Sequence, residues 1–329
     1  AAPTYISEIS SAAKRGRLVA LYQFNIVFGI LIAFISNYLL NGVGGDNDWR
    51  WMLGVEAIPA ALYCLLILGV PNSPRWLAVT KNDTVGALQT LELIHGDSAT
   101  AKAELDAIVN HSDKSPNTQN VFSGKYNKSL LLAFLLAFFN QLSGINFILY
   151  YAPVILENAG FASSDSLLSS ISIGGTNLIF TFVGLYLIDR MGRKSLMYIG
   201  SVGYIISLAM VAYGFKTEAS AGFNLFFILT FIASHAVGQG AVIWVFISEI
   251  FPNSVRAAGQ AWGTGTHWVF AALITMLGEV VIEAFPGWTV FAFFAAFMVL
   301  QLMFTHFIMP ETKGVSLEEL QDQLTQKDA

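Results

Sequence analysis

The sequence predicts an all-α polytopic membrane protein. Hydrophobic residues make up 55% of the chain and charged residues only 12%, whereas a soluble domain has about 25% charged residues. The mean hydropathy is +0.59. Apolar runs of about 20 residues or more can cross the bilayer as helices. Eight such runs lie at about 18–41, 50–70, 129–157, 166–188, 195–215, 223–251, 257–284 and 288–309. The alternative, a soluble protein with buried helices, does not explain why the charges gather in short clusters between these runs.

The charged loops predict the orientation of the spans. When the gaps between spans are assigned alternately to two sides, 15 of the 17 Lys and Arg residues fall on one side, and only Arg50 and Lys216 fall on the other. Cytoplasmic loops carry the excess of basic residues. We therefore expect a multi-pass protein of the cell (plasma or inner) membrane, with both ends of this chain in the cytoplasm.

The elements follow in order along the chain. Two spans precede a polar segment, in which "DTVGALQTLELIHG" (83–96) and "SATAKAELDAIVNH" (98–111) have apolar residues at helical spacing. These predict a small cytoplasmic helical domain, and the linker "SDKSPNTQN" (112–120) follows it. Six more spans and a short polar tail complete the chain. The expected domains are 1–77 (end of an N-terminal half), 78–128 (intracellular helices and linker), 129–310 (six-helix half) and 311–329 (tail).

A repeated pattern indicates two related halves. "YISEISSAAKR" (5–15) and "FISEIFPNSVR" (246–256) each place an Arg seven residues after a Glu, and each is followed by two spans. Those pairs of spans end in "PNSPR" (71–75) and "PETKG" (310–314). Four spans precede the second copy and none precedes the first. A transporter of two parallel six-helix halves explains this arrangement, and we expect this chain to begin inside the first half, without its first four helices.

The motifs together resemble those of one transporter family. They are "PTYISEISSAAKRG" (3–16), "PNSPRWL" (71–77), "NQLSGIN" (140–146), "DRMGRK" (189–194), "FISEIFPNSVR" (246–256) and "PETKGVSLEE" (310–319). In this order and spacing the chain resembles the sugar porter family of the major facilitator superfamily, which contains bacterial proton–sugar symporters and facilitative glucose transporters. The resemblance implies an N-terminally truncated major facilitator fold whose eight spans are helices 5 to 12.

Polar side chains inside the spans are the candidates for a sugar site. Sugar hydroxyls both donate and accept hydrogen bonds, as amide side chains do, and polar groups within a membrane face the bundle interior. The resemblance implies substrate contacts at Gln23, Ile26, Ile30, Asn140, Gln141, Asn146, Asn177, Trp244, His267 and Trp268. For Ile26 and Ile30, an apolar helix face that needs no ligand is an equal explanation. Asn140 stands where the family usually has Gln, and His267 where Asn or Gln is frequent. His267 would donate to the sugar, titrate near neutral pH, or pack as a neutral ring.

Two further groups have roles implied by the resemblance. Tyr150 and Tyr151 resemble tyrosines of the outer gate, and an interfacial aromatic belt is the alternative. Opposite charges at cytoplasmic helix ends resemble a latch between the halves, although a positive-inside signal alone is the simpler interpretation for single lysines. The expected latch residues are Glu8, Arg15, Asp189, Arg190, Arg193, Lys194, Glu249, Arg256 and Glu311.

The sequence therefore favours transport of a monosaccharide, a hexose or a pentose, by alternating access with proton symport. A facilitative uniporter, a transport-dead sugar sensor and a non-functional fragment are the alternatives. The sequence has no nucleotide-binding loop, zinc-ligand spacing or nucleophile–base arrangement, so we expect neither an enzyme nor a cofactor. The expected partners are the sugar, protons and the lipid bilayer; no nucleic acid is expected, and the protein is expected to be a monomer.

Overall fold

The membrane spans are helices, as the apolar runs predict. The computed structural model describes residues 5, 9, 15–112, 120–252, 254–315, 320 and 323–324. Within these residues, eight helical segments are long and apolar enough to span a membrane, in the same order along the chain as the eight predicted runs. The chain divides into two units, residues 1–26 with 40–118 and residues 27–39 with 119–329. Helix α2 (Arg15–Leu40) contributes to both of them.

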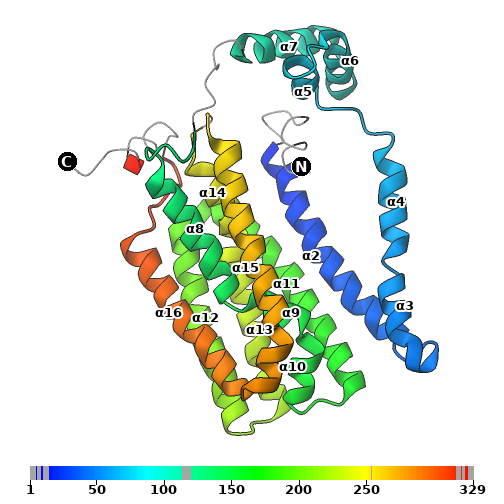
Figure 1. The fold of residues 1–329 in the computed structure, drawn as a ribbon, viewed down its shortest axis with the longest axis vertical. Coiled ribbons are helices and arrows are strands. Elements are labelled where there is room, and N and C mark those ends of the chain that lie inside the picture. Colours follow the sequence, from blue (N-terminus) through cyan, green and yellow to red (C-terminus); the bar gives the residue numbers. More distant parts are fainter. Residues whose placement is uncertain are drawn as a thin grey trace. The chain divides into compact units, whose positions relative to one another are not determined.

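The first unit contains short helices. Two of them, α3 (Asp48–Gly54) and α4 (Ala57–Ile67), divide the second predicted span at Val55 and Glu56. The polar segment forms α5 (Pro74–Val79), α6 (Thr84–His95) and α7 (Ser98–Ser112), and the last two match the predicted amphipathic helices. These three helices pack together (Figure 1) around a small core of Ala78, Ala87, Leu91, Ala101 and Leu105.

Local sequence explains where these short helices begin and end. The Ser73 hydroxyl accepts the Trp76 N–H at 3.2 Å, and Pro74 occupies the first helical position of α5. Asp83 accepts the Gly86 N–H at 2.8 Å at the start of α6. Gly96 ends α6 with a φ of 68°, a left-handed conformation that glycine adopts without strain.

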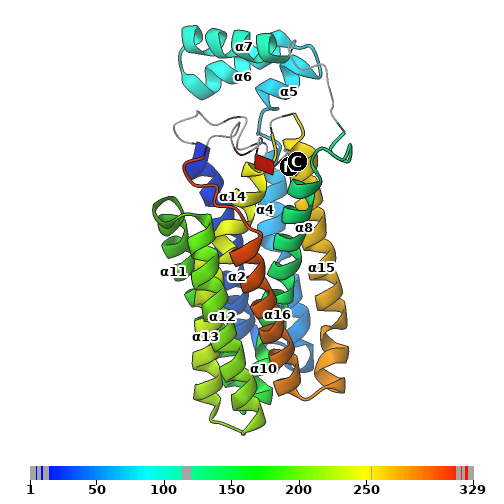
Figure 2. The same cartoon turned by 90° about the vertical axis from the view of Figure 1, so that its left-hand side faces the viewer.

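The second unit is a helical bundle that holds most of the buried residues. Its helices are α8 (Asn127–Leu142), α9 (Ile145–Tyr150), α10 (Ala152–Asn158), α11 (Ser163–Met191), α12 (Arg193–Lys216), α13 (Ala221–Val237), α14 (Gln239–Glu249), α15 (Arg256–Ala284) and α16 (Gly287–Phe307). Helix α12 packs against α13 and α16, and α8 packs against α15 (Figures 1 and 2). Two apolar clusters fill the bundle, one around Phe246 and Phe251 and the other around Tyr204 and Phe231.

Two of the predicted spans in the second unit are also not continuous helices. The run at 129–157 breaks after Leu142 and again at Tyr151, and the first break falls at the Ser143–Gly144 pair, two residues that favour helices weakly. The run at 223–251 breaks at Gly238, which separates α13 from α14. The breaks after Leu142 and at Gly238 place the buried polar residues Ser143 and Gln239 in the interior of the bundle, where irregular backbone within a membrane protein is tolerated.

Candidate functional site

The break between α8 and α9 organises the first group of polar side chains. Gly144 has a φ of 83°, which few residues other than glycine adopt. The Ser143 hydroxyl donates to the Asn140 carbonyl at 2.6 Å and accepts the Ile145 N–H at 3.3 Å. These contacts satisfy backbone groups that the interrupted helix leaves without partners. The break brings the side chain of Asn146, beyond it, back toward Gln141.

Gln141 is the centre of this group, and its side chain is fully buried. Its Oε1 accepts a hydrogen bond from Asn146 Nδ2 at 3.0 Å, and its Nε2 donates to Asn140 Oδ1 at 3.2 Å. The same Nε2 lies 3.2 Å from both ring nitrogens of His267 on α15. We call Asn140, Gln141, Asn146 and His267 the amide–histidine cluster.

Aromatic rings adjoin this cluster. The Trp244 ring on α14 lies 4.9 Å from the His267 ring, centroid to centroid, at an interplanar angle of 61°. Trp268 is half exposed, and its ring lies 5.2 Å from that of His267 at 83°. Amide groups that donate and accept, next to aromatic rings, form the kind of surface that binds a hydroxyl-rich ring.

Two other predicted contact residues of the second unit are not members of the amide–histidine cluster. Asn177 is buried in α11 and, among the described residues, makes no hydrogen bond to the cluster. Ile30 packs against the apolar cluster around Tyr204, while Gln23 and Ile26 belong to the first unit.

The two predicted gate tyrosines differ from each other. Tyr150 is exposed. The Tyr151 hydroxyl donates to the Thr275 carbonyl at 2.8 Å, and its ring packs against Gly278, so that a β-carbon at that glycine would overlap it.

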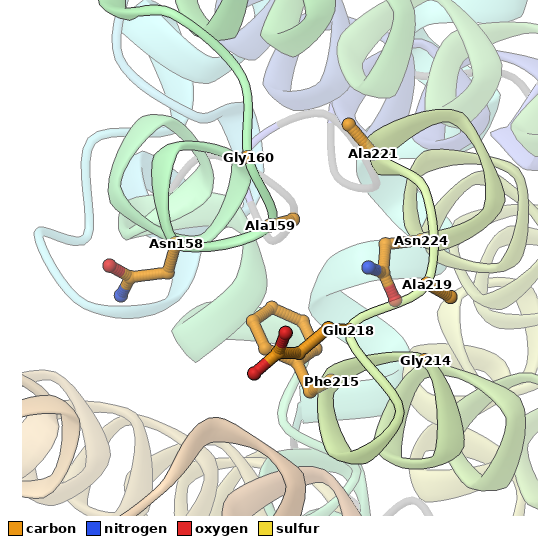
Figure 3. A pocket seen from close by; sticks show the side chains of 9 residues that line it. All are labelled: Asn158, Ala159, Gly160, Gly214, Phe215, Glu218, Ala219, Ala221 and Asn224. Carbon is orange, nitrogen blue, oxygen red and sulfur yellow. The ribbon is translucent and has the colours of Figure 1, made fainter.

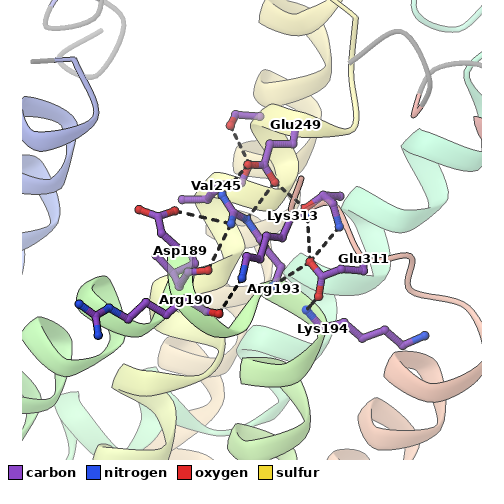
Figure 4. A network of polar contacts seen from close by, with 11 residues as sticks. Asp189, Arg190, Arg193, Lys194, Val245, Glu249, Glu311 and Lys313 are labelled. Atoms are coloured by element: carbon purple, nitrogen blue, oxygen red, sulfur yellow. Dashed lines mark hydrogen bonds and ion pairs between the residues drawn. The ribbon is translucent and has the colours of Figure 1, made fainter. Parts of the chain in front are cut away.

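The second group of polar side chains surrounds Arg193 at the start of α12 (Figure 4). Its guanidinium donates twice to Glu249, Nη2 to Oε1 at 2.7 Å and Nε to Oε2 at 3.2 Å. Nη1 also donates to the Ile188 carbonyl at 3.2 Å and lies 3.6 Å from Asp189. The side chains of Arg193 and Glu249 are only 11% and 24% exposed. This pair is a bidentate contact of the strong kind, in contrast to exposed surface ion pairs.

Glu311 completes this network from the segment after α16. Its carboxylate accepts backbone N–H groups at 2.9 Å from Arg193, Lys194, Thr312 and Lys313. Burial raises the pKa of this carboxyl, but the four N–H donors outweigh burial and hold the pKa below its ordinary value. The first two donors belong to the N-terminus of α12, where a negative charge also favours the helix dipole. Glu311 therefore ties the chain after α16 to the start of α12.

Gly192 is required by this contact. Its φ is 88°, and a β-carbon there would lie 2.6 Å from Glu311 Oε2. We call Asp189, Arg193, Glu249 and Glu311 the charge cluster.

Three other predicted latch residues, all in the second unit, make different contacts. Arg190 stacks over the Tyr186 ring at 4.1 Å, and Arg256 donates to the Phe251 carbonyl at 3.2 Å. Lys194 directs its ammonium to the His306 carbonyl at 3.2 Å. Glu8 lies outside the described residues, and of Arg15 the structure describes only its place at the start of α2.

Two contacts were not predicted. The Thr312 hydroxyl donates to Glu249 Oε2 at 2.5 Å, and the only signal for this contact is that Thr312 follows Glu311 in "PETKG". The Tyr204 hydroxyl and His235 Nδ1 lie 2.6 Å apart inside the bundle. They are 31 residues apart on different helices, and no local pattern indicates their pairing.

Comparison with known proteins identifies the family. A family model described as "Sugar (and other) transporter" matches residues 1–324. The chain belongs to this family. It is 35% identical to the arabinose-proton symporter of Bacillus subtilis, over 97% of this chain and 70% of that protein. It is 33% identical to the galactose-proton symporter of Escherichia coli K12, over 98% and 70% of the two chains.

Solved structures of a relative show the same fold. This chain superimposes on the inward-open xylose transporter XylE of E. coli with a TM-score of 0.82. The two are 31% identical over 98% of this chain and 68% of XylE. The proton:xylose symporter XylE bound to 6-bromo-6-deoxy-D-glucose gives a TM-score of 0.77. This sugar transporter family member is therefore an integral membrane protein with the major facilitator fold.

Proposed function

We propose that the protein carries a monosaccharide across the membrane by alternating access, coupled to protons. The observation that carries this proposal is the amide–histidine cluster with its adjoining tryptophans, placed at a helix break inside a membrane-spanning bundle. The relatives support the choice of a sugar and of proton coupling, since the names of three are arabinose-, galactose- and D-xylose-proton symporter. A pentose or a hexose fits these names equally.

Helix α14 gives alternating access a physical basis. It has 11 residues, and it carries Trp244 beside the amide–histidine cluster and Glu249 in the charge cluster. At 1.5 Å per residue these two positions are about 7–8 Å apart along the helix axis. Because α14 begins at the Gly238 break, it can tilt as one element. We propose that sugar bound beside Trp244 biases such a tilt, and with it the contact between Glu249 and Arg193.

Several residues have proposed roles in this cycle. Gln23, Ile26, Ile30 and Asn177 would complete the sugar site, and Tyr150 and Tyr151 would close it from outside. The charge cluster, with Glu8, Arg15, Arg190, Lys194 and Arg256, would hold the cytoplasmic side closed.

Binding and transport should be measured separately. We expect titration of xylose, arabinose and galactose into the purified protein to change its tryptophan fluorescence for at least one of them. Gln141→Ala should weaken that binding by about ten-fold or more, because it removes hydrogen bonds to hydroxyls and leaves neighbouring polar groups unpaired. Gln89→Ala makes the same substitution on α6 of the first unit, away from the proposed site residues in sequence, and serves as the control; it should leave sugar binding unchanged. Undiminished affinity in Gln141→Ala would exclude this site.

Uptake by proteoliposomes then distinguishes the alternatives. Proton symport predicts that an inward proton gradient drives accumulation and that a protonophore abolishes it. A facilitative uniporter would equilibrate the sugar without accumulating it. Binding without any uptake would favour a sensor or a non-functional fragment over a transporter.

A further inference from the structure

A histidine and a tyrosine are paired in the middle of the second unit. The Tyr204 hydroxyl on α12 and Nδ1 of His235 on α13 lie 2.6 Å apart. His235 is the middle residue of the span Ala221–Glu249, and Tyr204 lies near the middle of the span Arg193–Lys216. Coupling ions of membrane transporters bind near this depth of the bilayer. Neither residue belongs to the amide–histidine cluster or to the charge cluster.

The two rings differ in their surroundings. Tyr204 is fully buried, and its ring lies 5.2 Å from that of Phe231, centroid to centroid. His235 is partly exposed. A β-carbon at Gly240 of α14 would lie 3.2 Å from its Nε2, so the imidazole packs against the first turn of α14 at a residue that has no side chain. The His235 ring therefore contacts both α12 and the helix that we expect to tilt.

Tyr204 connects His235 to the α8–α9 break. Its hydroxyl also interacts with the hydroxyl of Ser143 at that break. The Ser143 hydroxyl donates to one backbone carbonyl and accepts one backbone N–H. A hydroxyl oxygen can accept two hydrogen bonds, so Ser143 has one acceptor position left for Tyr204. The line from His235 through Tyr204 to Ser143 thus ends at the break that shapes the amide–histidine cluster.

His235 has no counter-ion within the part of the chain that the structure describes, where no carboxylate forms an ion pair with it. Of the helices packed against α13, α12 presents Tyr204, α14 presents Gly240 and α11 presents Gly184 beside Ala236. His267 on α15 acts on the ring electrostatically. The acidic and basic residues of α10, α11, α12 and α14 occupy the first or last three positions of their helices: Glu157, Asp165, Asp189, Arg190, Arg193, Lys194, Lys216 and Glu249.

A hollow at the start of α13 supplies no counter-ion either. Its volume is about 330 Å³, and the α10–α11 and α12–α13 connections surround it (Figure 3). Glu218 is the only charged residue in its lining. His235 lies about 20 Å from the first residue of α13 along the helix axis. A buried imidazole without a counter-ion is neutral, and one that accepts the Tyr204 O–H at Nδ1 carries its hydrogen on Nε2.

We propose that His235 is the binding site of the coupled proton, an inference that rests on the proposed proton-coupled transport. When Nδ1 takes up a proton from water, both ring nitrogens are donors, and Nδ1–H donates to the Tyr204 oxygen. The Tyr204 O–H then turns to the free acceptor position of Ser143. This reversal ties α12 to the α8–α9 break and stabilises the arrangement that binds sugar. By reciprocity, bound sugar favours the protonated ring, and the proton returns to water when the sugar leaves.

The pH dependence of sugar affinity tests the coupling. For a sugar that binds the purified full chain, tryptophan fluorescence should give an about ten-fold lower Kd at about pH 5.5 than at about pH 8. His235→Gln and Tyr204→Phe should each keep the affinity measured at the higher pH and lose this dependence. A merely structural role for the pair would not remove the pH dependence selectively.

Other histidines provide the controls. His306 is exposed at the end of α16 and lies 2.8 Å from the Tyr198 hydroxyl through its Nδ1, so His306→Gln breaks a similar pair elsewhere and should keep the pH dependence. Equal loss in His306→Gln and His235→Gln, or an unchanged pH dependence in His235→Gln, would overturn the proposal. Loss in His267→Gln but not in His235→Gln would assign the proton to the amide–histidine cluster instead.

A measurement without sugar separates this proposal from the proposed function. The chain has five histidines, so carbon-13-labelled histidine gives few ring signals in NMR spectra, and the signal missing in His235→Gln identifies His235. We expect this signal to titrate, and its midpoint to move by about one pH unit in Tyr204→Phe, the effect of one hydrogen bond to a charged group. A signal that is constant between about pH 4 and 8 would overturn the proton site, whether or not sugar binds. A titrating signal in a chain that binds none of the sugars would contradict the proposed function and leave the proton site in place.

Discussion

The α8–α9 break should be sensitive to a single methyl group at Gly144. Its φ of 83° costs a non-glycine residue about 1–2 kcal/mol. A β-carbon there would also lie 2.6 Å from Cδ2 of Phe294, and such overpacking costs about 1–3 kcal/mol. We therefore expect Gly144→Ala to lower the free energy of unfolding by about 2–5 kcal/mol. The altered break should also weaken sugar binding, because it sets the contact between Gln141 and Asn146.

Reversible unfolding in mixed micelles, followed by tryptophan fluorescence, measures this loss. Gly175→Ala is the matched control, since a β-carbon at this helical glycine of α11 meets nothing within 4 Å; alanine there should be neutral or stabilising. Phe294→Leu in the Gly144→Ala background should relieve the overlap with the new methyl group and so recover the steric part of the lost stability. A double-mutant cycle should show this as an interaction energy of about 1–3 kcal/mol. Unchanged stability in Gly144→Ala, or strict additivity in the cycle, would refute the reasoning.

Three more perturbations test the second unit. Thr312→Val removes the hydrogen bond to Glu249 and should destabilise by about 1.5–3 kcal/mol, whereas Thr312→Ser should keep most of the stability; equal losses would show that the hydroxyl is not responsible. The pKa of Glu311 is lower in the folded state than in the unfolded state, so the unfolded state takes up the proton first as pH falls. Glu311 therefore contributes its full stabilisation above its ordinary pKa, and this stabilisation is lost as pH falls through the folded-state pKa. Thermal unfolding between pH 3 and 7 should therefore be less pH-dependent in Glu311→Gln, and parallel curves would contradict this. Gln239→Leu removes two buried amide atoms that have no partner among the described residues, and should raise the unfolding free energy by about 1–3 kcal/mol; a loss of stability would show that the amide is satisfied by another group.

The sequence was sufficient for features that depend on composition and short motifs. The eight spans follow from long apolar runs, and α6 and α7 from helical spacing of apolar residues. The break at Ser143–Gly144 also has a local signal, because glycine after a small polar residue weakens a helix. The family could be inferred because its motifs are short and ordered, and the match over residues 1–324 confirms it.

Contacts between distant segments could not be read in the same way. Gln301 on α16 donates to Ser201 on α12 at 2.8 Å across 100 residues, and nothing local to either residue indicates the other. The role of Glu311 is similar, because its partners are backbone N–H groups, which every residue except proline has. Which helices lie beside one another decides such pairs, and that depends on packing over the whole bundle.

The Gly238 break shows how packing can replace a local signal. The sequence "GQGAVIW" (238–244) has no proline, the residue that most directly interrupts a helix, so the local signal for a break is weak. In the structure, a β-carbon at Gly238 would lie 2.7 Å from the Gly200 Cα of α12, and one at Gly200 would lie 2.9 Å from the Gly238 Cα. Small residues let membrane helices approach this closely, and Gly238 takes φ and ψ of −86° and −106°, outside the helical region. The break between α13 and α14 is therefore accompanied by a close contact between Gly238 and a second glycine, Gly200, on another helix. A relative that lacks prolines at this position should have the same break only if both glycines are present.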